Sequence, residues 1–355
     1  MVCALTFSFH RQQSIHYITP NASLLTPNFL LLTLTKGVQA VSTVNARTRS
    51  LSREYRRQRR LRELPLHLML IPGLALLIIF HYVPMFGIVM AFENFKPAKG
   101  FFGSKWVGWD NFVYMAKLPN MGSVLYNTVF IAVLKIIMGM IVPIFVALML
   151  NEIGNKPFKR TVQTIVYFPH FLSWVILGGV LMDVLSPSTG IVNDLIRFFG
   201  GKPIYFLGDK GWFPYTMVIT AVWKNFGYDT IVYLAALTNV DRNLYEAASI
   251  DGATRMQQTW HVTLPGILPI VTLMGVLNLG NILNAGFDQI FNLSNAAVSN
   301  VSETLGMYIY RITFASPPDF GFSVAVSLFR SIINLILLLL ANQGSKWLSG
   351  TGLFA

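Results

Sequence analysis

The sequence predicts an all-α membrane protein with six transmembrane helices, and its composition and its apolar segments both point to this class. Apolar residues make up 54% of the 355 residues and charged residues only 12%, about half of the charged fraction usual in soluble domains. Six segments reach the length of roughly 20 mainly apolar residues that a helix needs to cross a bilayer. We predict these spans at residues 67–92, 125–150, 161–185, 214–238, 266–290 and 321–342.

The predicted spans differ in the polar residues that interrupt them. Prolines 72, 84, 143 and 169 lie inside predicted spans, where neighbouring helices can satisfy the freed carbonyl groups. Six ionisable residues are also predicted at or near membrane depth, where they are costly and are functional candidates: Lys135, Asp183, Lys224, Asp229, Asp288 and Arg330. For Lys224, which lies deepest, we expect a carboxylate partner. For the other five, contact with water at a span end or extension to the interface is weighed equally with a substrate role.

A basic arm precedes the first span and predicts the orientation of the chain. Eight arginines lie between residues 47 and 62, a cluster typical of a cytoplasmic membrane flank that contacts anionic lipid. With this arm inside, the cytoplasmic segments hold 14 Lys and Arg residues and the external loops hold 8. Both termini are therefore predicted in the cytoplasm. Nucleic-acid binding is not indicated, because Tyr55 is the only aromatic residue within the arm.

The chain divides into five predicted regions. Residues 1–46 are interpreted as a disordered leader or as an extension from an incorrect start codon, and 47–64 as the basic arm. Residues 65–120 hold the first helix and an external loop, 121–346 the remaining helices, and 347–355 a cytoplasmic tail. The single cysteine, Cys3, forms no internal disulfide, and the histidines show no metal-ligand spacing.

The loop at 241–265 carries the most specific pattern in the sequence. We predict two short helices around a glycine turn, with Asp241 as the N-cap of the first and Gly252 supplying left-handed backbone at its end. Met256 and Trp260 then lie one turn apart on the second helix, and Pro265 is predicted to open the fifth span. The fixed positions of the pattern are Glu246, Ala247, Ala248, Asp251, Gly252, Ala253, Trp260, Leu264 and Pro265.

This pattern, E-A-A-x-x-D-G-A followed by an aromatic residue and L-P, resembles the EAA loop of binding-protein-dependent ABC importer permeases. Trp260 fills the aromatic position that is often Phe. The resemblance covers nearly the whole chain from about residue 65 and includes the runs at 234–237 and 286–293. Together these runs resemble the LplB-like branch that handles complex sugars and polysaccharide fragments.

The resemblance implies a type I importer permease of the MalF-like, or MetI-like, fold in the cell membrane. Its partners would be a second, related permease, two ATPase subunits, an extracytoplasmic solute-binding protein and a sugar substrate. The loop would dock in a groove of the ATPase with Glu246 facing a basic residue. The sequence contains no G-x-x-x-x-G-K-[ST] phosphate loop, so we expect no catalysis and no cofactor in this chain, and ATP bound by the partner subunit.

Polar and aromatic residues of the fourth and fifth spans are predicted to line the substrate path. Aromatic rings and amides together suit neutral, hydroxyl-rich ligands, and the candidates are Trp223, Tyr228, Asn278, Asn281 and Asn284. We expect Asn278, Asn281, Ala285 and Asp288 on one helix face. The alternative is that the asparagines hydrogen-bond to neighbouring helices and hold the bundle together.

Three other functions were weighed. The same fold could import a peptide, an amino acid or an anion; an anion importer should gather Lys and Arg around its cavity. An ion-coupled secondary carrier would not need the docking loop. A membrane-embedded enzyme is not indicated, because the sequence shows no paired carboxylates, histidine cluster or nucleophile motif.

Overall fold

The computed structural model describes residues 63–65, 67–314 and 317–350 of the chain. The prediction for residues 1–46, nearly all of the basic arm, and the end of the tail lie outside these residues. The chain separates into two compact units, Met1–Pro84 and Met85–Ala355. In the first unit the described residues are helical and include the π-helical turn η1 (Ile78–Tyr82), and their apolar side chains are exposed.

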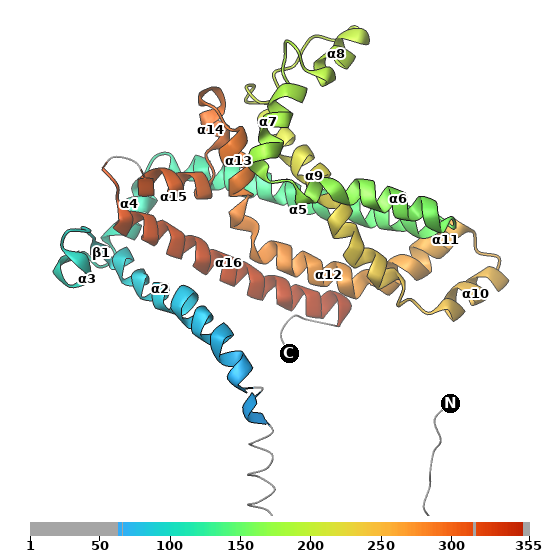
Figure 1. Cartoon of the computed structure of the whole chain (residues 1–355), viewed down its shortest axis with the longest axis horizontal. Helices are drawn as coiled ribbons and strands as arrows, with labels where there is room; N and C mark the ends of the chain where they lie inside the picture. Colours follow the sequence, from blue (N-terminus) through green and yellow to red (C-terminus); the bar gives the residue numbers. More distant parts are fainter. Residues whose placement is uncertain (1–62, 66, 315–316, 351–355) are drawn as a thin grey trace, which may run out of the picture. The chain divides into compact units, whose positions relative to one another are not determined.

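The second unit is almost entirely helical (Figure 1). Its long helices are α5 (Met121–Glu152), α9 (Phe213–Leu237), α12 (Leu264–Gly280) and α16 (Phe320–Ser349). The shorter helices are α3 (Gly100–Gly103), α4 (Asp110–Lys117), α6 (Lys156–Tyr167), α7 (Trp174–Val184), α8 (Ile191–Phe198), α10 (Arg242–Ile250), α11 (Arg255–Gln258), α13 (Phe287–Leu293), α14 (Ser299–Ser302) and α15 (Leu305–Phe314). The remaining elements are α2 (Val83–Met85), the 3₁₀ helices η2 (Phe86–Phe92), η3 (Phe168–Phe171), η5 (Ile282–Asn284) and η6 (Ala296–Val298), the π-helix η4 (Thr259–Thr263), and the antiparallel strands β1 (Glu93–Asn94) and β2 (Lys105–Trp106).

Helices α5, α9, α12 and α16 form the body of this unit, and a buried core runs between them. α5 packs along α9, and α12 packs against α16. Fully buried side chains include Ile131, Leu177, Phe213 and Met217. Many other large apolar residues of the long helices are exposed, as expected for surfaces that meet lipid or another membrane subunit.

Four described helices are long and apolar enough to cross a membrane, and they match four of the predicted spans. They are Glu63–Phe92, Met121–Glu152, Arg255–Gly280 and Phe320–Trp347. α9 matches the predicted fourth span in position and has 25 residues. Its polar residues make it less apolar than these four helices, and it is not among them. The count of six transmembrane helices therefore stays a prediction.

The predicted third span, 161–185, is not one continuous helix. The chain bends by 103° between Lys156–Phe171 and Trp174–Val184. Pro169 lies within η3, where proline restricts the backbone and removes a hydrogen-bond donor, and the Ser173 hydroxyl caps α7 by accepting from the Ile176 N–H at 3.3 Å. The first half of the predicted span contains Thr161, Gln163 and Thr164 and is less apolar than the second. Pro169 marks the region of the bend, but a proline inside a span can also be accommodated without one.

α6 and α9 approach each other at Gly227. A Cβ atom built at this position would lie 2.0 Å from the backbone oxygen of Val166, far inside van der Waals contact. Gly227 is therefore required for the close packing of these two helices.

The predicted fifth span, 266–290, is also wrong as a single helix. The helix covers Arg255–Gly280 and ends there. The chain then passes through η5, a left-handed residue at Ala285 (φ 47°) and Gly286 (φ 77°) before α13 begins. Side-chain and backbone contacts to α5 and α16, described below, stabilise this break.

Candidate coupling loop and translocation path

The predicted loop at 241–265 folds as two helices around a turn, and the predicted caps are present. The Asp241 Oδ1 atom accepts a hydrogen bond from the Asn243 N–H at 2.9 Å and begins α10. α10 ends at a left-handed Gly252 (φ 79°), and the Ala253 N–H closes the turn on the Ala248 carbonyl oxygen at 2.9 Å. Thr254 and Gln257 form a capping box at the start of α11. Local sequence thus determines both helix ends.

Side chains hold α10 against the second helix, and the sequence analysis missed them. The Gln258 Nε2 atom donates to the Ser249 Oγ atom at 3.0 Å and to the Ala253 carbonyl oxygen at 3.1 Å. The hydroxyl groups of Tyr245 and Thr263 lie 3.0 Å apart. Gln258 is 9% exposed, so the bonds that it makes are shielded from water. No local spacing signals these contacts, which join two helices.

The outer surface of the loop is not covered by any other part of the chain that the structure describes. None of the residues of α10 is buried, and Glu246 and Ala247 are exposed. Large apolar side chains project from the same loop: Leu244, Ile250, Met256 and Trp260, with Ile250 86% exposed and Trp260 63% exposed. Exposed apolar side chains on a capped, ordered loop are typical of a surface that another protein covers.

A groove of about 860 Å³ separates this loop from the ends of α5 and α9. Glu246 and Tyr245 line it on one side, and Asn151 and Glu152 on another. Arg255 and Glu152 form an ion pair across 3.7 Å. Figure 1 shows α10 and α11 together at one end of the unit, and the opposite end of α5 lies beside α15.

Pro265 lies in the first turn of α12, but the membrane helix does not begin there as predicted. The helix continues from Arg255 through the π-helical turn η4 into α12. The Leu264 N–H bonds to the Thr259 carbonyl oxygen, five residues back. Because proline has no N–H group, one carbonyl oxygen of the preceding turn lacks its usual donor. The wider turn accommodates both this carbonyl group and the proline ring. Leu264 is half-buried and Pro265 exposed at this point.

Of the predicted path residues in α9, Tyr228 has a protein partner. Its ring stacks on the His170 ring with centroids 4.0 Å apart and planes 4° apart. Trp223 and Tyr228 are each 44% exposed. Among the described residues Lys224 has no carboxylate partner, contrary to the prediction: its Nζ atom donates to the His170 carbonyl oxygen at 2.6 Å and lies 5.7 Å from the centre of the Trp174 ring. A backbone carbonyl oxygen at the bend thus accepts from the ammonium group.

The asparagines of the predicted fifth span do not share a helix face with Ala285 and Asp288, because the helix ends at Gly280. Asn278 lies in the last turn of α12 and is half-buried. The Asn281 Nδ2 atom donates to the Leu277 carbonyl oxygen at 3.3 Å, and the Asn284 Oδ1 atom accepts from Arg330 Nη2 at 3.4 Å. The contact of Asn284 with α16 fits the alternative that the asparagines hold neighbouring helices together, whereas the bond of Asn281 stays within its own segment. Their role in the path stays a prediction.

A polar network spans the break between α12 and α13. The Lys135 Nζ atom of α5 donates to the Ala285 carbonyl oxygen at 2.8 Å and to the Gln289 Oε1 atom at 2.6 Å. Gln289, 1% exposed, donates in turn to the Met217 carbonyl oxygen at 2.8 Å and to the Thr220 Oγ1 atom at 2.7 Å on α9. Lys135 therefore does not extend to an interface, and Gln289 is a structural residue that the sequence analysis did not identify.

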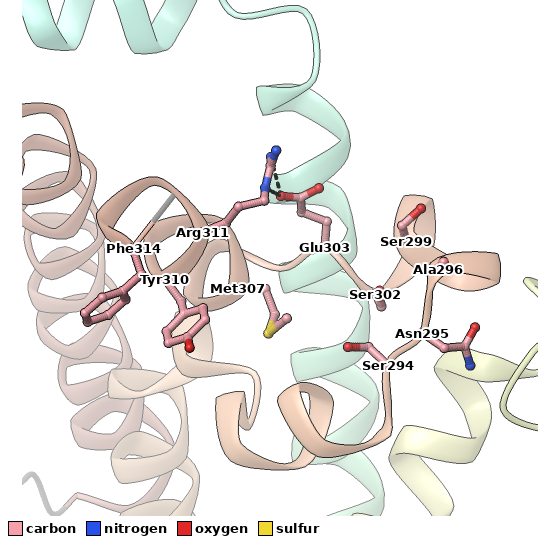
Figure 2. Close-up of a pocket in the computed structure, with 10 residues that line it drawn as sticks. All are labelled: Ser294, Asn295, Ala296, Ser299, Ser302, Glu303, Met307, Tyr310, Arg311 and Phe314. Atoms are coloured by element: carbon pink, nitrogen blue, oxygen red, sulfur yellow. Dashed lines mark hydrogen bonds and ion pairs between the residues drawn. The ribbon is translucent and has the colours of Figure 1, made fainter. Parts of the chain in front are cut away.

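A second hollow lies at the end of α5 opposite the loop (Figure 2). It has a volume of about 570 Å³ and is formed by the segment between α13 and α15. Its lining residues are Ser294, Asn295, Ala296, Ser299, Ser302, Glu303, Met307, Tyr310, Arg311 and Phe314.

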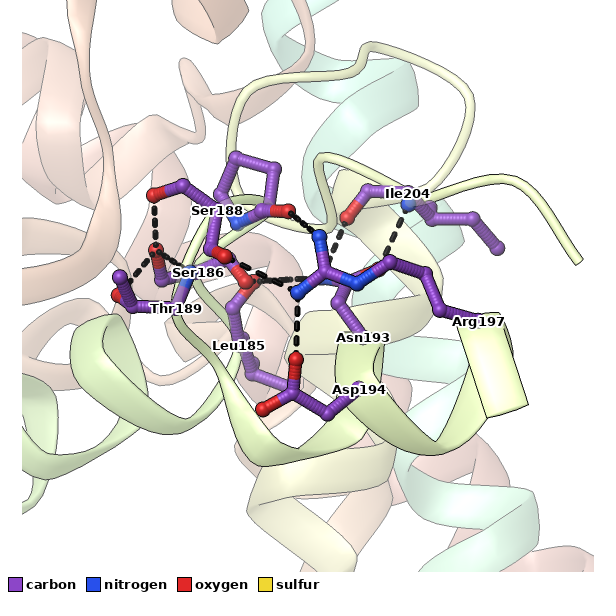
Figure 3. A network of polar contacts seen from close by, with 9 residues as sticks. Leu185, Ser186, Ser188, Thr189, Asn193, Asp194, Arg197 and Ile204 are labelled. Atoms are coloured by element: carbon purple, nitrogen blue, oxygen red, sulfur yellow. Dashed lines mark hydrogen bonds and ion pairs between the residues drawn. The ribbon is translucent and has the colours of Figure 1, made fainter.

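The connection between α7 and α9 is ordered by a single buried asparagine (Figure 3). Asn193 Nδ2 donates to the carbonyl oxygens of Ser186 and Ile204, each at 3.0 Å, and its Oδ1 atom accepts from the Ile204 N–H at 2.7 Å. Arg197 donates to the carbonyl oxygens of Pro187 and Ser188. The loop is thereby fixed, and α8 presents exposed apolar residues, namely Ile191, Leu195 and Phe198.

Several helices long and apolar enough to cross a membrane, together with the capped and exposed loop, describe a polytopic membrane protein. Residues 139–348 match the family described as "Binding-protein-dependent transport system inner membrane component". The chain belongs to this family.

Relatives and solved structures support this assignment. The chain is 40% identical to the polygalacturonan/rhamnogalacturonan transport system permease protein YteP of Bacillus subtilis (strain 168), over 81% of this chain and 90% of the relative. It is 38% identical to protein LplB of the same strain, over 81% and 91%. It is also similar to a chain of a bacterial ABC transporter involved in the import of the acidic polysaccharide alginate, with a TM-score of 0.74 and 36% identity over 81% of this chain and 97% of that chain.

A related crystal structure holds such a transporter with a partner. It is a bacterial alginate ABC transporter in complex with an alginate pentasaccharide-bound periplasmic protein, and a chain of it matches with a TM-score of 0.76 and 35% identity over 83% of this chain and 99% of that chain. The predicted family and permease fold are confirmed by these similarities.

Proposed function

We propose that the chain is the membrane-spanning permease subunit of an ATP-driven importer for oligosaccharides or polysaccharide fragments, coupled to a separate ATPase through residues 241–265. The observation that carries this proposal is the loop itself. Its caps and internal hydrogen bonds keep α10 ordered, yet its apolar side chains and Glu246 have no cover in this chain. In a permease of this family, such a surface fits an ATPase.

The complex would contain a second permease, two ATPase subunits and an extracytoplasmic solute-binding protein. The exposed apolar surfaces of α7 and of the long helices support a second membrane subunit. The related transporter in complex with a periplasmic protein supports the solute-binding protein. The loop and both termini would lie in the cytoplasm, in agreement with the arginine arm before the first span.

An acidic oligosaccharide is the substrate class that the sequence and the relatives support together. Two similar transport proteins are described as handling polygalacturonan or rhamnogalacturonan, and the acidic polysaccharide alginate. Within the helices of this chain, Lys135 and Lys224 donate to oxygen atoms inside the bundle. Arg330 is half-buried beside Asn284 and forms none of the ion pairs found among the described residues. It is therefore the cationic residue of these helices that we propose for contact with an anionic group of the transported molecule.

Transport assays test this function. The permease, a candidate second permease, the ATPase and the binding protein are reconstituted in vesicles, and uptake of labelled oligosaccharides from galacturonan, rhamnogalacturonan and alginate is measured with a neutral maltopentaose control. We expect uptake of at least one acidic oligosaccharide, and we expect this uptake to require ATP on the cytoplasmic side of the vesicle membrane. Uptake driven by an ion gradient without ATP would instead identify a secondary carrier and refute the proposal.

A further inference from the structure

The hollow between α13 and α15 combines an aromatic wall with a charged one (Figure 2). Tyr310 and Phe314 form the aromatic wall, 38% and 72% exposed, with ring centroids 5.0 Å apart. Behind them, the Tyr310 ring packs against Phe291 at 4.9 Å and Phe287 at 5.6 Å. The exposed ring of Tyr310 is thus held in place from behind.

The charged wall is an ion pair that is open to the hollow. Arg311 Nε donates to the Glu303 Oε1 atom at 2.8 Å, and Arg311 also lies 5.4 Å from the centre of the Tyr308 ring. The Glu303 and Arg311 side chains are 28% and 60% exposed, so both still reach solvent. Arginine carries five donors and a carboxylate accepts several hydrogen bonds, which leaves capacity for a ligand.

The floor of the hollow is fixed to α5. Asn127 Nδ2 donates to the Asn300 carbonyl oxygen at 2.7 Å and to that of Glu303 at 3.3 Å. The Thr128 Oγ1 atom accepts from the Leu305 N–H at 2.8 Å. Because these bonds are buried or half-buried, the hollow keeps its shape without a ligand.

The position of the hollow along α5 indicates on which side of the membrane it opens. Asn127 and Glu152 are 25 residues apart on α5, so the hollow lies about 38 Å along the helix from the coupling loop. A bilayer hydrocarbon core is about 30 Å thick. If the loop is cytoplasmic, as the proposed function has it, the hollow opens at the opposite, external side.

We propose that this hollow is an entry subsite for one sugar unit of the oligosaccharide as it leaves the binding protein. A sugar ring would stack on Tyr310, while its hydroxyl groups donate to Glu303 and its oxygens, including a uronate carboxylate, accept from Arg311. An aromatic platform with a few placed polar groups in a preformed hollow is the usual composition of a ligand site. The inference rests on the proposed function and adds a site to it that the predicted path residues do not include.

Direct binding tests the subsite apart from transport. Labelled pentagalacturonate is equilibrated with the assembled transporter in lipid nanodiscs, without the binding protein, for the wild type and for Tyr310→Ala, Tyr310→Trp and Arg311→Gln. We expect roughly tenfold weaker binding for Tyr310→Ala and Arg311→Gln, the effect of losing one good contact, and near-normal binding for Tyr310→Trp. Tyr126→Ala is the matched control, since Tyr126 is an exposed aromatic residue on α5 that does not line the hollow.

Docking of the loaded binding protein and basal ATP hydrolysis are measured on the same samples, and both should stay unchanged in all variants. Unchanged pentagalacturonate binding in Tyr310→Ala, or an equal loss in Tyr126→Ala, would overturn the subsite while wild-type transport still supported the proposed function. A loss of binding-protein docking in Tyr310→Ala would identify the hollow as a protein contact and also overturn it. Absence of any oligosaccharide transport by the wild type would refute the proposed function, and the subsite with it.

Discussion

The two ends of α5 are built in different ways. At the Glu152 end, the loop is ordered by short-range caps and a few side-chain bonds, and its apolar residues face outward. At the other end, the segment from α13 to α15 is bonded to α5 by Asn127 and Thr128 and buries Val298 and Leu305 completely. One end is a surface that needs a partner, whereas the other is a hollow that the chain completes alone. Substitutions at the first should therefore affect coupling, and substitutions at the second should affect stability.

The largest effect is expected at the turn of the coupling loop. Gly252→Pro should abolish ATP hydrolysis stimulated by the loaded binding protein, because a proline φ near −65° cannot replace the observed φ of 79°. Glu246→Ala should do the same by removing the exposed carboxylate. Stimulated ATPase activity of the assembled complex is the measurement, and membrane insertion should stay normal.

Gly154→Ala is the matched control for the turn, because Gly154 lies just after α5 with nothing within 4 Å of its added Cβ atom. Wild-type transport by assembled Gly252→Pro or Glu246→Ala complexes would show that the loop does not couple to the ATPase.

The second largest effect is expected at the end of α5 that carries Asn127, and it should lower the free energy of unfolding. Asn127→Ala leaves the Asn300 and Glu303 carbonyl oxygens without this donor and should cost about 1–3 kcal/mol of unfolding free energy. Thermal unfolding in detergent measures the loss against Ser123→Ala, whose hydroxyl bonds only within its own turn and is exposed. Equal melting temperatures for the two variants would mean that these bonds do not hold the hollow.

Gln258→Leu should have a smaller effect and one confined to coupling. The substitution removes two hydrogen bonds that hold α10 and should loosen the loop by about 1–2 kcal/mol, lowering stimulated ATPase activity several-fold. The melting temperature should change little, because the loop opens as a local unit. Gln343→Leu, at an exposed site on α16, serves as the control. A large drop in melting temperature would contradict the proposed contrast between the two ends.

The smallest effect is expected for the ion pair beside the loop. Arg255 and Glu152 are 85% and 60% exposed and 3.7 Å apart, so their interaction should contribute less than about 0.5 kcal/mol. A double-mutant cycle with Arg255→Gln and Glu152→Gln, followed by thermal unfolding and ATPase assays, measures it. A coupling energy above about 1 kcal/mol would show that the pair helps to fix the loop.

The contrast also explains which features the sequence could predict. The caps of α10 and the turn at Gly252 depend on residues a few positions apart, and the sequence predicts them correctly. The bend after Phe171 and the break after Gly280 fall inside runs long enough for one span each, and the prolines and asparagines there also occur in continuous membrane helices, so the sequence analysis predicted single helices. The partner of Lys135 lies 150 residues away at Ala285, and Tyr310 lies in the short helix α15, which carries no distinctive motif. Features that depend on distant contacts needed the structure.

The π-helical turn before Pro265 has a mechanical consequence. Because the turn keeps the helix unbroken, Arg255–Gly280 forms a single rod of 26 residues, about 39 Å long. A tilt of about 10° about the loop end of such a rod displaces the Gly280 end by roughly 7 Å. The left-handed residues Ala285 and Gly286 follow shortly after the end of this helix. We therefore expect a tilt of Arg255–Gly280 to change the backbone angles of the segment between α12 and α13.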